Sequence, residues 1–323
     1  MLPRVIVLLV CTLVVEANGA DPAISFLENR VKNDSDDFVA QNQLASRYLD
    51  LLRVTGDDQY RAKARRAAEA SVAVGLSELN NGGIAALARV QLASHQFAAA
   101  RDNAKKLRML APGKSYSFGI LGDALLELGD YDEAAAAFGE LTKAESGGLN
   151  SETRLAQLAL VRGELKAARD HFTTALEAAK NLTPPAPALV AWCGVQLGQL
   201  SFNRGDWEKA EKQYQAALEA LPDYWAALEH VAELRGAQQK YPEAIALYQK
   251  VIERVPRPEL AQALGDLYAF MGKTAEAKPW HERAGSPVPQ RPRRNHRRNQ
   301  DGLNLSQQRE TEENTSQGWD RPT

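Results

Sequence analysis

Cysteine is nearly absent from this sequence of 323 residues, in which only Cys11 and Cys193 carry a thiol. Two thiols cannot make a disulfide framework, and they fall short of the Cys and His ligands that a structural zinc site needs. Cys193 is therefore interpreted as a small apolar residue of a helix. A catalytic thiol is the alternative, and it is disfavoured because free cysteines are so often simply buried.

Aromatic residues and net charge are also scarce. Aromatic residues make up 7% of the chain and the formal net charge is -2, whereas hydrophobic residues make up 44% and alanine is abundant. Alanine favours tightly packed helices over strands. The net charge argues neither for nor against a nucleic-acid partner, so the distribution of charge has to decide. The composition predicts a helical protein with a sizeable core.

No catalytic or metal-binding motif is apparent. Pro112-Gly113-Lys114-Ser115 resembles the end of a phosphate-binding loop, but the first glycine of that motif would fall at Arg108. His281-Glu282 lacks the second histidine of a zinc-protease helix. Acidic pairs such as Asp132-Glu133 lie where a helix is expected to begin, and there a carboxylate caps free amides. We therefore predict a non-enzymatic protein with no cofactor and no metal.

Long hydrophobic runs are missing except at the start of the chain. Arg4 is followed by the apolar run Val5–Val15, and small residues precede possible cleavage points after Ala17 and Ala20. This order is typical of an export signal, and the run is too short for a stable membrane span. We expect residues 1–20 to be a signal peptide and the mature protein to be periplasmic or extracellular, without a membrane span.

The segment 191–222 shows what the chain does contain. Leu197-Gly198 lies in one helical run, Gly205 marks a turn, and Ala210 and Tyr214 lie on one face of a second run that a proline ends. The small residues Gly198 and Ala210 allow two antiparallel helices to approach closely. Such a pair has an apolar face that it cannot bury alone, so neighbouring pairs are expected.

The same pattern recurs along the chain at a nearly constant interval. The equivalents of the turn residue are separated by 34, 34, 42, 34 and 33 residues, and they are His95, Gly129, Gly163, Gly205, Gln239 and Gly272. A small residue follows each of them five positions later, at Ala100, Ala134, Ala168, Ala210, Ala244 and Ala277. The one long interval contains a proline-rich insertion at 181–188, which is expected to lengthen a loop without breaking the array.

This recurrence resembles the tetratricopeptide repeat, a helix–turn–helix unit of 34 residues. The resemblance covers about residues 23–284, and it implies an all-α fold, a right-handed superhelical solenoid of stacked helix pairs. We expect three parts, which are the signal peptide at 1–20, a solenoid of about six to seven repeats at 21–285, and a disordered tail at 286–323.

The tail changes composition abruptly and contains the basic cluster 291–298. A segment with so few aliphatic residues is expected to be disordered. The basic cluster is interpreted as a solvated tail or as out-of-frame sequence, with an arm for nucleic acid or an anionic surface as the alternative. The array also lacks a polar capping helix at its end, so we expect a truncated member of a longer array.

By resemblance, tetratricopeptide arrays bind an extended peptide or a partner helix along the concave face that their first helices line. The leading hypothesis is an exported, non-enzymatic binding scaffold of bacterial type. The alternative is a regulatory or assembly segment of a larger exported enzyme or secretion system. An RNA-binding repeat protein is disfavoured because the inner face is not basic, so no nucleic-acid partner is expected.

Counting back from the turn residues gives the side chains expected on that concave face. One position in each repeat is Arg89, Asp123, Gln157, Gln199, Glu233 and Asp266, a set that we call the groove row. Glu229 lies one turn before Glu233, and Trp192 and Phe202 are expected to offer apolar contacts midway. The acidic end of this surface favours a basic or neutral protein or peptide. The carboxylate-clamp class of the family uses Lys and Asn here, and neither occurs at these positions.

Overall fold

The computed structural model describes residues 22–74 and 80–285, and the chain is entirely helical in those ranges. The predicted signal peptide and the predicted tail lie outside the described residues. The helices are α1 (Pro22–Asn33), α2 (Phe38–Thr55), α3 (Gln59–Ala73), α4 (Asn81–Ala93), α5 (Phe97–Leu110), α6 (Tyr116–Leu128), α7 (Tyr131–Ala144), α8 (Leu149–Val161), α9 (Leu165–Lys180), α10 (Pro187–Asn203), α11 (Trp207–Ala220), α12 (Trp225–Ala237), α13 (Tyr241–Arg254), α14 (Pro258–Phe270) and α15 (Thr274–Arg283).

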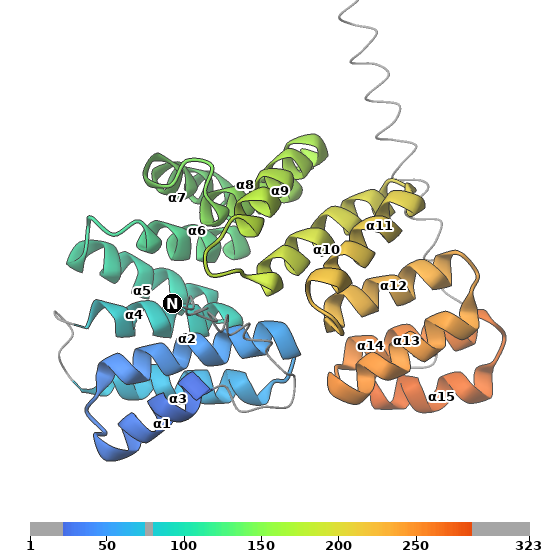
Figure 1. Cartoon of the computed structure of the whole chain (residues 1–323), viewed down its shortest axis with the longest axis horizontal. Coiled ribbons are helices and arrows are strands. Elements are labelled where there is room, and N and C mark those ends of the chain that lie inside the picture. Colours follow the sequence, from blue (N-terminus) through green and yellow to red (C-terminus); the bar gives the residue numbers. More distant parts are fainter. Residues whose placement is uncertain (1–21, 75–79, 286–323) are drawn as a thin grey trace, which may run out of the picture.

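These helices form a solenoid of stacked hairpins (Figure 1). Helix α1 packs on α2, and α2 to α15 make seven consecutive pairs, which we number as repeats one to seven. Within each pair the two helices contact each other, and the first helix of each pair follows the second helix of the preceding pair. The all-helical solenoid predicted from the sequence is therefore confirmed.

The turn between the two helices of each repeat has a left-handed residue at the predicted position. Gly129, Gly163, Gly205 and Gly272 have φ between 76° and 88°. His95 and Gln239 adopt the same conformation with φ of 56° and 62°, although a side chain makes it less favourable. Gly56, with φ of 70°, is the corresponding residue of repeat one. The phase counted from the sequence is thus confirmed at all six predicted turns.

The interior of the solenoid is built from small residues opposite rings. The alanines that follow the turns by five positions are all 0% exposed, and they are Ala100, Ala134, Ala168, Ala210, Ala244 and Ala277. Four positions later come Phe138 and Phe172, which are also fully buried. Gly122 leaves room for Phe138, because a Cβ atom on that glycine would lie 2.2 Å from the ring. Small residues therefore set the close approach of the helices.

The proline-rich insertion lengthens one connection and leaves the stack continuous. Helix α9 ends at Lys180 and α10 begins at Pro187. Across this loop Phe172 and Trp192 pack edge to face, with ring centroids 5.7 Å apart. Phe172 also shares a core cluster with Leu197 and Leu200 of α10. The fourth and fifth repeats thus stay packed together, as expected for an insertion in the loop.

The solenoid also bends far enough for distant repeats to touch. In Figure 1 the end of α2 faces the beginning of α12 across the middle of the molecule. The indole Nε1 of Trp225 donates a hydrogen bond to the carbonyl oxygen of Arg53 at 3.2 Å. Repeats one and six are therefore in direct contact.

Candidate functional site

The groove row occupies one equivalent position on each first helix from α4 to α14. Equivalent positions in stacked repeats lie on the same side of a solenoid, and this side is open to solvent. Arg89 is exposed. The other members of the row are half-buried, namely Asp123, Gln157, Gln199, Glu233 and Asp266. The row thus forms a polar surface that keeps contact with solvent.

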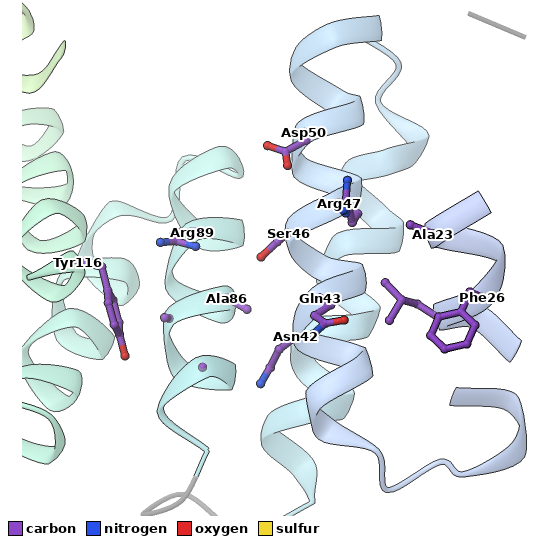
Figure 2. A pocket seen from close by; sticks show the side chains of 13 residues that line it. Ala23, Phe26, Asn42, Gln43, Ser46, Arg47, Asp50, Ala86, Arg89 and Tyr116 are labelled. Carbon is purple, nitrogen blue, oxygen red and sulfur yellow. The ribbon is translucent and has the colours of Figure 1, made fainter. Parts of the chain in front are cut away.

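The N-terminal part of this surface is hollowed. A cavity of about 640 Å³ lies between α1, α2, α4 and α6, and Arg89 lines it (Figure 2). Asn42, Ser46 and Asp50 extend from the side of α2 that faces α4 in this view. Tyr116 from α6 closes the opposite side. The cavity is lined by α1 and by first helices, which are the helices that carry the groove row.

Two lining residues of this cavity were not identified from the sequence. Asp50 lies six residues before the turn residue Gly56, so it is the member of the groove row in repeat one. Ser46 lies one helical turn earlier, where repeat two has Ala85. Gly56 lies 39 residues before His95, whereas most successive turns are 33 or 34 residues apart, and this longer interval obscured the phase of this repeat. The glycine before Asp57-Asp58 was the signal that could have identified both residues.

The charges in the N-terminal half are unevenly paired. Arg154 Nε and Nη2 donate to the two carboxylate oxygens of Asp123 at 2.9 and 2.8 Å, which is a bidentate ion pair. Burial raises the pKa of Asp123, while Arg154 and Arg89 act in the opposite direction. The surrounding protein and the charge of Arg154 lower the pKa of Arg89, although its side chain keeps contact with solvent. Within the described ranges no ion pair involves Arg89.

A second hollow brings two predicted residues together. Asp123 of α6 and Gln157 of α8 both line a cavity of about 270 Å³, with Leu92, Phe97 and Leu126 as its apolar part. Arg89 therefore belongs to the larger hollow, and Asp123 and Gln157 belong to the smaller one. The row is one surface with separate depressions between successive repeats.

The C-terminal half of the row is acidic. Glu229 and Glu233 lie one turn apart on α12, and the Glu233 side chain is 44% exposed. Burial is the largest cause that raises the pKa of Glu229; His230 and Arg257 act in the opposite direction, and the negative charges of Glu233 and Glu259 act in the same direction as burial. The imidazole of His230 lies 3.3 Å from the Glu233 carboxylate. A cationic group placed here would offset an existing repulsion between carboxylates.

The two aromatic residues expected midway along the groove have mainly packing roles. Phe202 is 7% exposed and shares a core cluster with Ala210, Tyr214 and Leu234. Trp192 is half-buried against Phe172. A side chain as buried as Phe202 offers almost no surface to a partner, so we leave it out of the candidate surface and retain the partly accessible Trp192.

Three kinds of site are relevant to the described residues, which are a metal site, a membrane span and a reactive thiol. No group of three His, Cys, Asp or Glu side chains in these ranges is arranged to hold a metal ion. None of the described helices combines the length and the apolar character needed to cross a membrane. Cys193 is fully buried, and burial raises the pKa of its thiol to about 12, which keeps it protonated.

Comparison with known proteins points to the same architecture. The family model of the tetratricopeptide repeat matches residues 85–144, 120–183 and 195–258, which together cover about half of the chain. No curated protein sequence matches the chain.

Two solved structures of similar fold cover most of the described residues. A chain of the APC/C hetero-tetramer Cut9–Hcn1 is similar with a TM-score of 0.57 and 15% identity, over 81% of this chain and 45% of that chain. A tetratricopeptide repeat protein from Parabacteroides merdae ATCC 43184 is similar with a TM-score of 0.51 and 16% identity, over 82% of this chain and 99% of that chain. This chain therefore spans less than half the length of the first structure.

Proposed function

Because the chain belongs to the tetratricopeptide repeat family, we propose that it is a non-enzymatic scaffold that holds a peptide or a partner helix along the groove row. Solenoids of this kind present extended concave surfaces for binding proteins. The hollows beside Arg89 and Asp123 provide depressions for side chains of a bound segment. The observation that carries this proposal is the continuous row of accessible polar side chains on successive first helices.

The acidic end of the row favours a basic or neutral segment as the partner. Like charges one turn apart destabilise a helix slightly, so the pair Glu229 and Glu233 has a cost in the free protein. A Lys or Arg side chain of a partner would replace that repulsion with attraction. Electrostatic attraction of this kind acts mostly on the association rate and weakens as salt is added.

Binding of short labelled peptides of equal length and different net charge would test the proposal. We expect fluorescence anisotropy to detect binding of peptides that carry Lys or Arg, and a faster association at low salt. The double variant Glu229→Lys with Glu233→Lys should weaken this binding about tenfold, which corresponds to about 1.4 kcal/mol. The proposal fails if acidic peptides bind as well as basic ones.

A matched control separates local from global charge effects. Glu219→Lys with Glu253→Lys makes the same change of net charge at exposed positions of the second helices α11 and α13. These positions lie outside the groove row, so peptide affinity should stay close to that of the parent protein. An equal loss in both double variants would assign the effect to net charge instead of to the groove.

We also propose that the protein is exported to the periplasm or the extracellular space. The support is the sequence of Arg4 and the apolar run Val5–Val15, which lie outside the described residues. N-terminal sequencing of the protein from its native host should find a mature chain that begins near Asn18 or Asp21. Recovery of an intact Met1 in a soluble cytoplasmic form would reject export.

A further inference from the structure

The contact between repeats one and six joins residues that are far apart in the sequence. The hydrogen bond from Trp225 to Arg53 spans 172 positions. Beside it, Gly56 is buried, and a Cβ atom on Gly56 would lie 2.9 Å from both methyl groups of Val255 and 3.2 Å from the Trp225 ring. We call these four residues the clasp.

Gly56 differs in this respect from the equivalent glycines of other repeats. Gly129, Gly163, Gly205 and Gly272 share its left-handed backbone, yet a Cβ atom on any of them would meet nothing within 4 Å. Those four turns are exposed. Among the described turn glycines, Gly56 of repeat one is the glycine that a distant part of the chain covers. This coverage is a local feature of the clasp and not a property of the repeat.

The sixth repeat holds its side of the clasp in place. The guanidinium of Arg257 lies 4.4 Å from the centre of the Trp225 ring, and the ring of Tyr224 packs edge to face on the indole at 6.4 Å. Tyr224 is 3% exposed and Val255 is 0% exposed. Trp225 thus packs against Tyr224 and Arg257 in the orientation in which its indole reaches Arg53.

The clasp is small compared with the contacts between neighbouring repeats. Successive repeats share buried clusters, as in the packing of Ile84 and Leu107 with Ile120, Leu121 and Phe138. The clasp joins one half-buried indole and one buried valine to a turn. If the array opens, the contact between repeats one and six is the place where the fewest buried groups separate.

We propose that the clasp keeps the array closed around its concave side and must open to admit a partner from the side. Only the second part of this proposal rests on the proposed function. In the closed array, repeats one and six are joined, so a bulky molecule cannot enter the groove between them. Release of Trp225 from Arg53 removes that barrier while each repeat stays folded.

Distance measurements on the full chain test whether the clasp sets the closed form. Spin labels would be placed at Glu69→Cys on α3 and Glu253→Cys on α13, both exposed positions, with Cys11→Ser and Cys193→Ala as background. We expect one narrow, short distance population in the parent. The clasp variants Gly56→Ala and Trp225→Ala should shift that population to longer distances, with helical circular dichroism retained.

Two control variants make the same kinds of substitution at positions outside the clasp. Gly205→Ala introduces an alanine at a left-handed turn that no other residue covers, and Trp207→Ala removes a tryptophan that is 40% exposed. Both should keep the short distance. A parent with a broad or long distance population would overturn the proposal, as would clasp variants that match their controls. If Gly56→Ala fails to fold, the comparison of Trp225→Ala with its control Trp207→Ala decides whether the clasp sets the closed form.

The effect on access is measured without any partner. In the same background, a single thiol from Arg89→Cys lies in the large hollow, where a small iodoacetamide and a bulky polyethylene-glycol maleimide can be compared. We expect Trp225→Ala to accelerate the bulky reagent several-fold relative to the small one, and Trp207→Ala to leave the ratio unchanged. An unchanged ratio in Trp225→Ala would overturn the role of the clasp in access, whatever the peptide experiments show.

Discussion

The ring of Tyr214 occupies the space that Gly198 leaves above the opposite helix. A Cβ atom on Gly198 would lie 2.3 Å from Cε1 of Tyr214, and the tyrosine is fully buried. No real side chain tolerates so short a contact, so the glycine and the ring require each other. The same relationship joins Gly122 to Phe138 in repeat three.

We predict that Gly198→Ala destabilises the protein by about 1–3 kcal/mol, because an added methyl group overpacks the contact with Tyr214. Chemical denaturation followed by circular dichroism measures the effect. Gly139→Ala is the control, since this glycine of α7 has no atom within 4 Å of its Cβ position. There the better helix propensity of alanine should stabilise by up to about 1 kcal/mol. Equal effects of the two changes would contradict this account of the interface.

A second prediction concerns the small residue that faces the first helix of each repeat. Ala210 is 0% exposed, so Ala210→Phe should cost about 1–3 kcal/mol through overpacking and lower the melting temperature. Ala216 lies on the exposed side of the same helix α11, and Ala216→Phe should change stability by less than about 0.5 kcal/mol. An unchanged melting temperature for Ala210→Phe would show that the assigned phase is wrong.

A third prediction concerns the ring position of the last repeat, where His281 replaces the Phe or Tyr of repeats three to six. His281 is 1% exposed and neither ring nitrogen has a hydrogen-bond partner among the described residues. The space at Gly265 is also wider, with the ring 3.0 Å from its Cβ position. We expect His281→Phe to stabilise by about 1 kcal/mol, since it removes two unsatisfied polar atoms. Thermal unfolding checks this, and a lower melting temperature would mean that the 3.6 Å contact with Asp266 outweighs them.

A fourth prediction is the pH dependence that Glu229 introduces. Burial raises its pKa in the folded protein above the ordinary glutamate value of about 4.3. As pH rises from the unfolded to the folded pKa, the unfolded chain loses its proton first, so this group lowers stability progressively and the full penalty persists at neutral pH. Glu229→Gln should therefore stabilise at pH ~7 and give no gain at pH ~3.

Urea unfolding of the parent and the variant at both pH values measures this difference. Glu253→Gln on the exposed side of α13 is the control and should show no comparable gain at neutral pH. A gain from Glu229→Gln that is the same at both pH values would point to packing instead of charge.

The repeats could be predicted from the sequence because their signals are local. Left-handed turns, buried alanines and opposing rings recur at fixed spacing, and spacing alone places His95 and Gln239 at turns, where both have a positive φ. The groove row follows from the same count. The binding role of the groove row does not follow from this count, because the repeat phase gives the position of a side chain and not whether a partner contacts it. For Phe202 the local sequence pattern does not distinguish a ring buried in the core from a ring on the concave surface.

Two features escaped sequence reasoning for physical reasons. Asp50 was missed because the interval of 39 residues between Gly56 and His95 departs from the spacing on which the count depends. The contact between Arg53 and Trp225 was missed because it depends on the accumulated rotation of five successive interfaces, in which small angular changes add up. No motif in either segment indicates that the two would meet.

Contact between repeats one and six also changes how free energy is distributed along the chain. In an open solenoid, stability is close to a sum of nearest-neighbour terms, and both end repeats fray because each has a single neighbour. Here the first repeat is held by α1, by the second repeat and by Trp225. Helices α14 and α15 form the last pair and pack on the sixth repeat through α13. Backbone amides should therefore be protected from hydrogen exchange unequally at the two ends of the array. We expect protection to stay high at α2 and to fall toward α15.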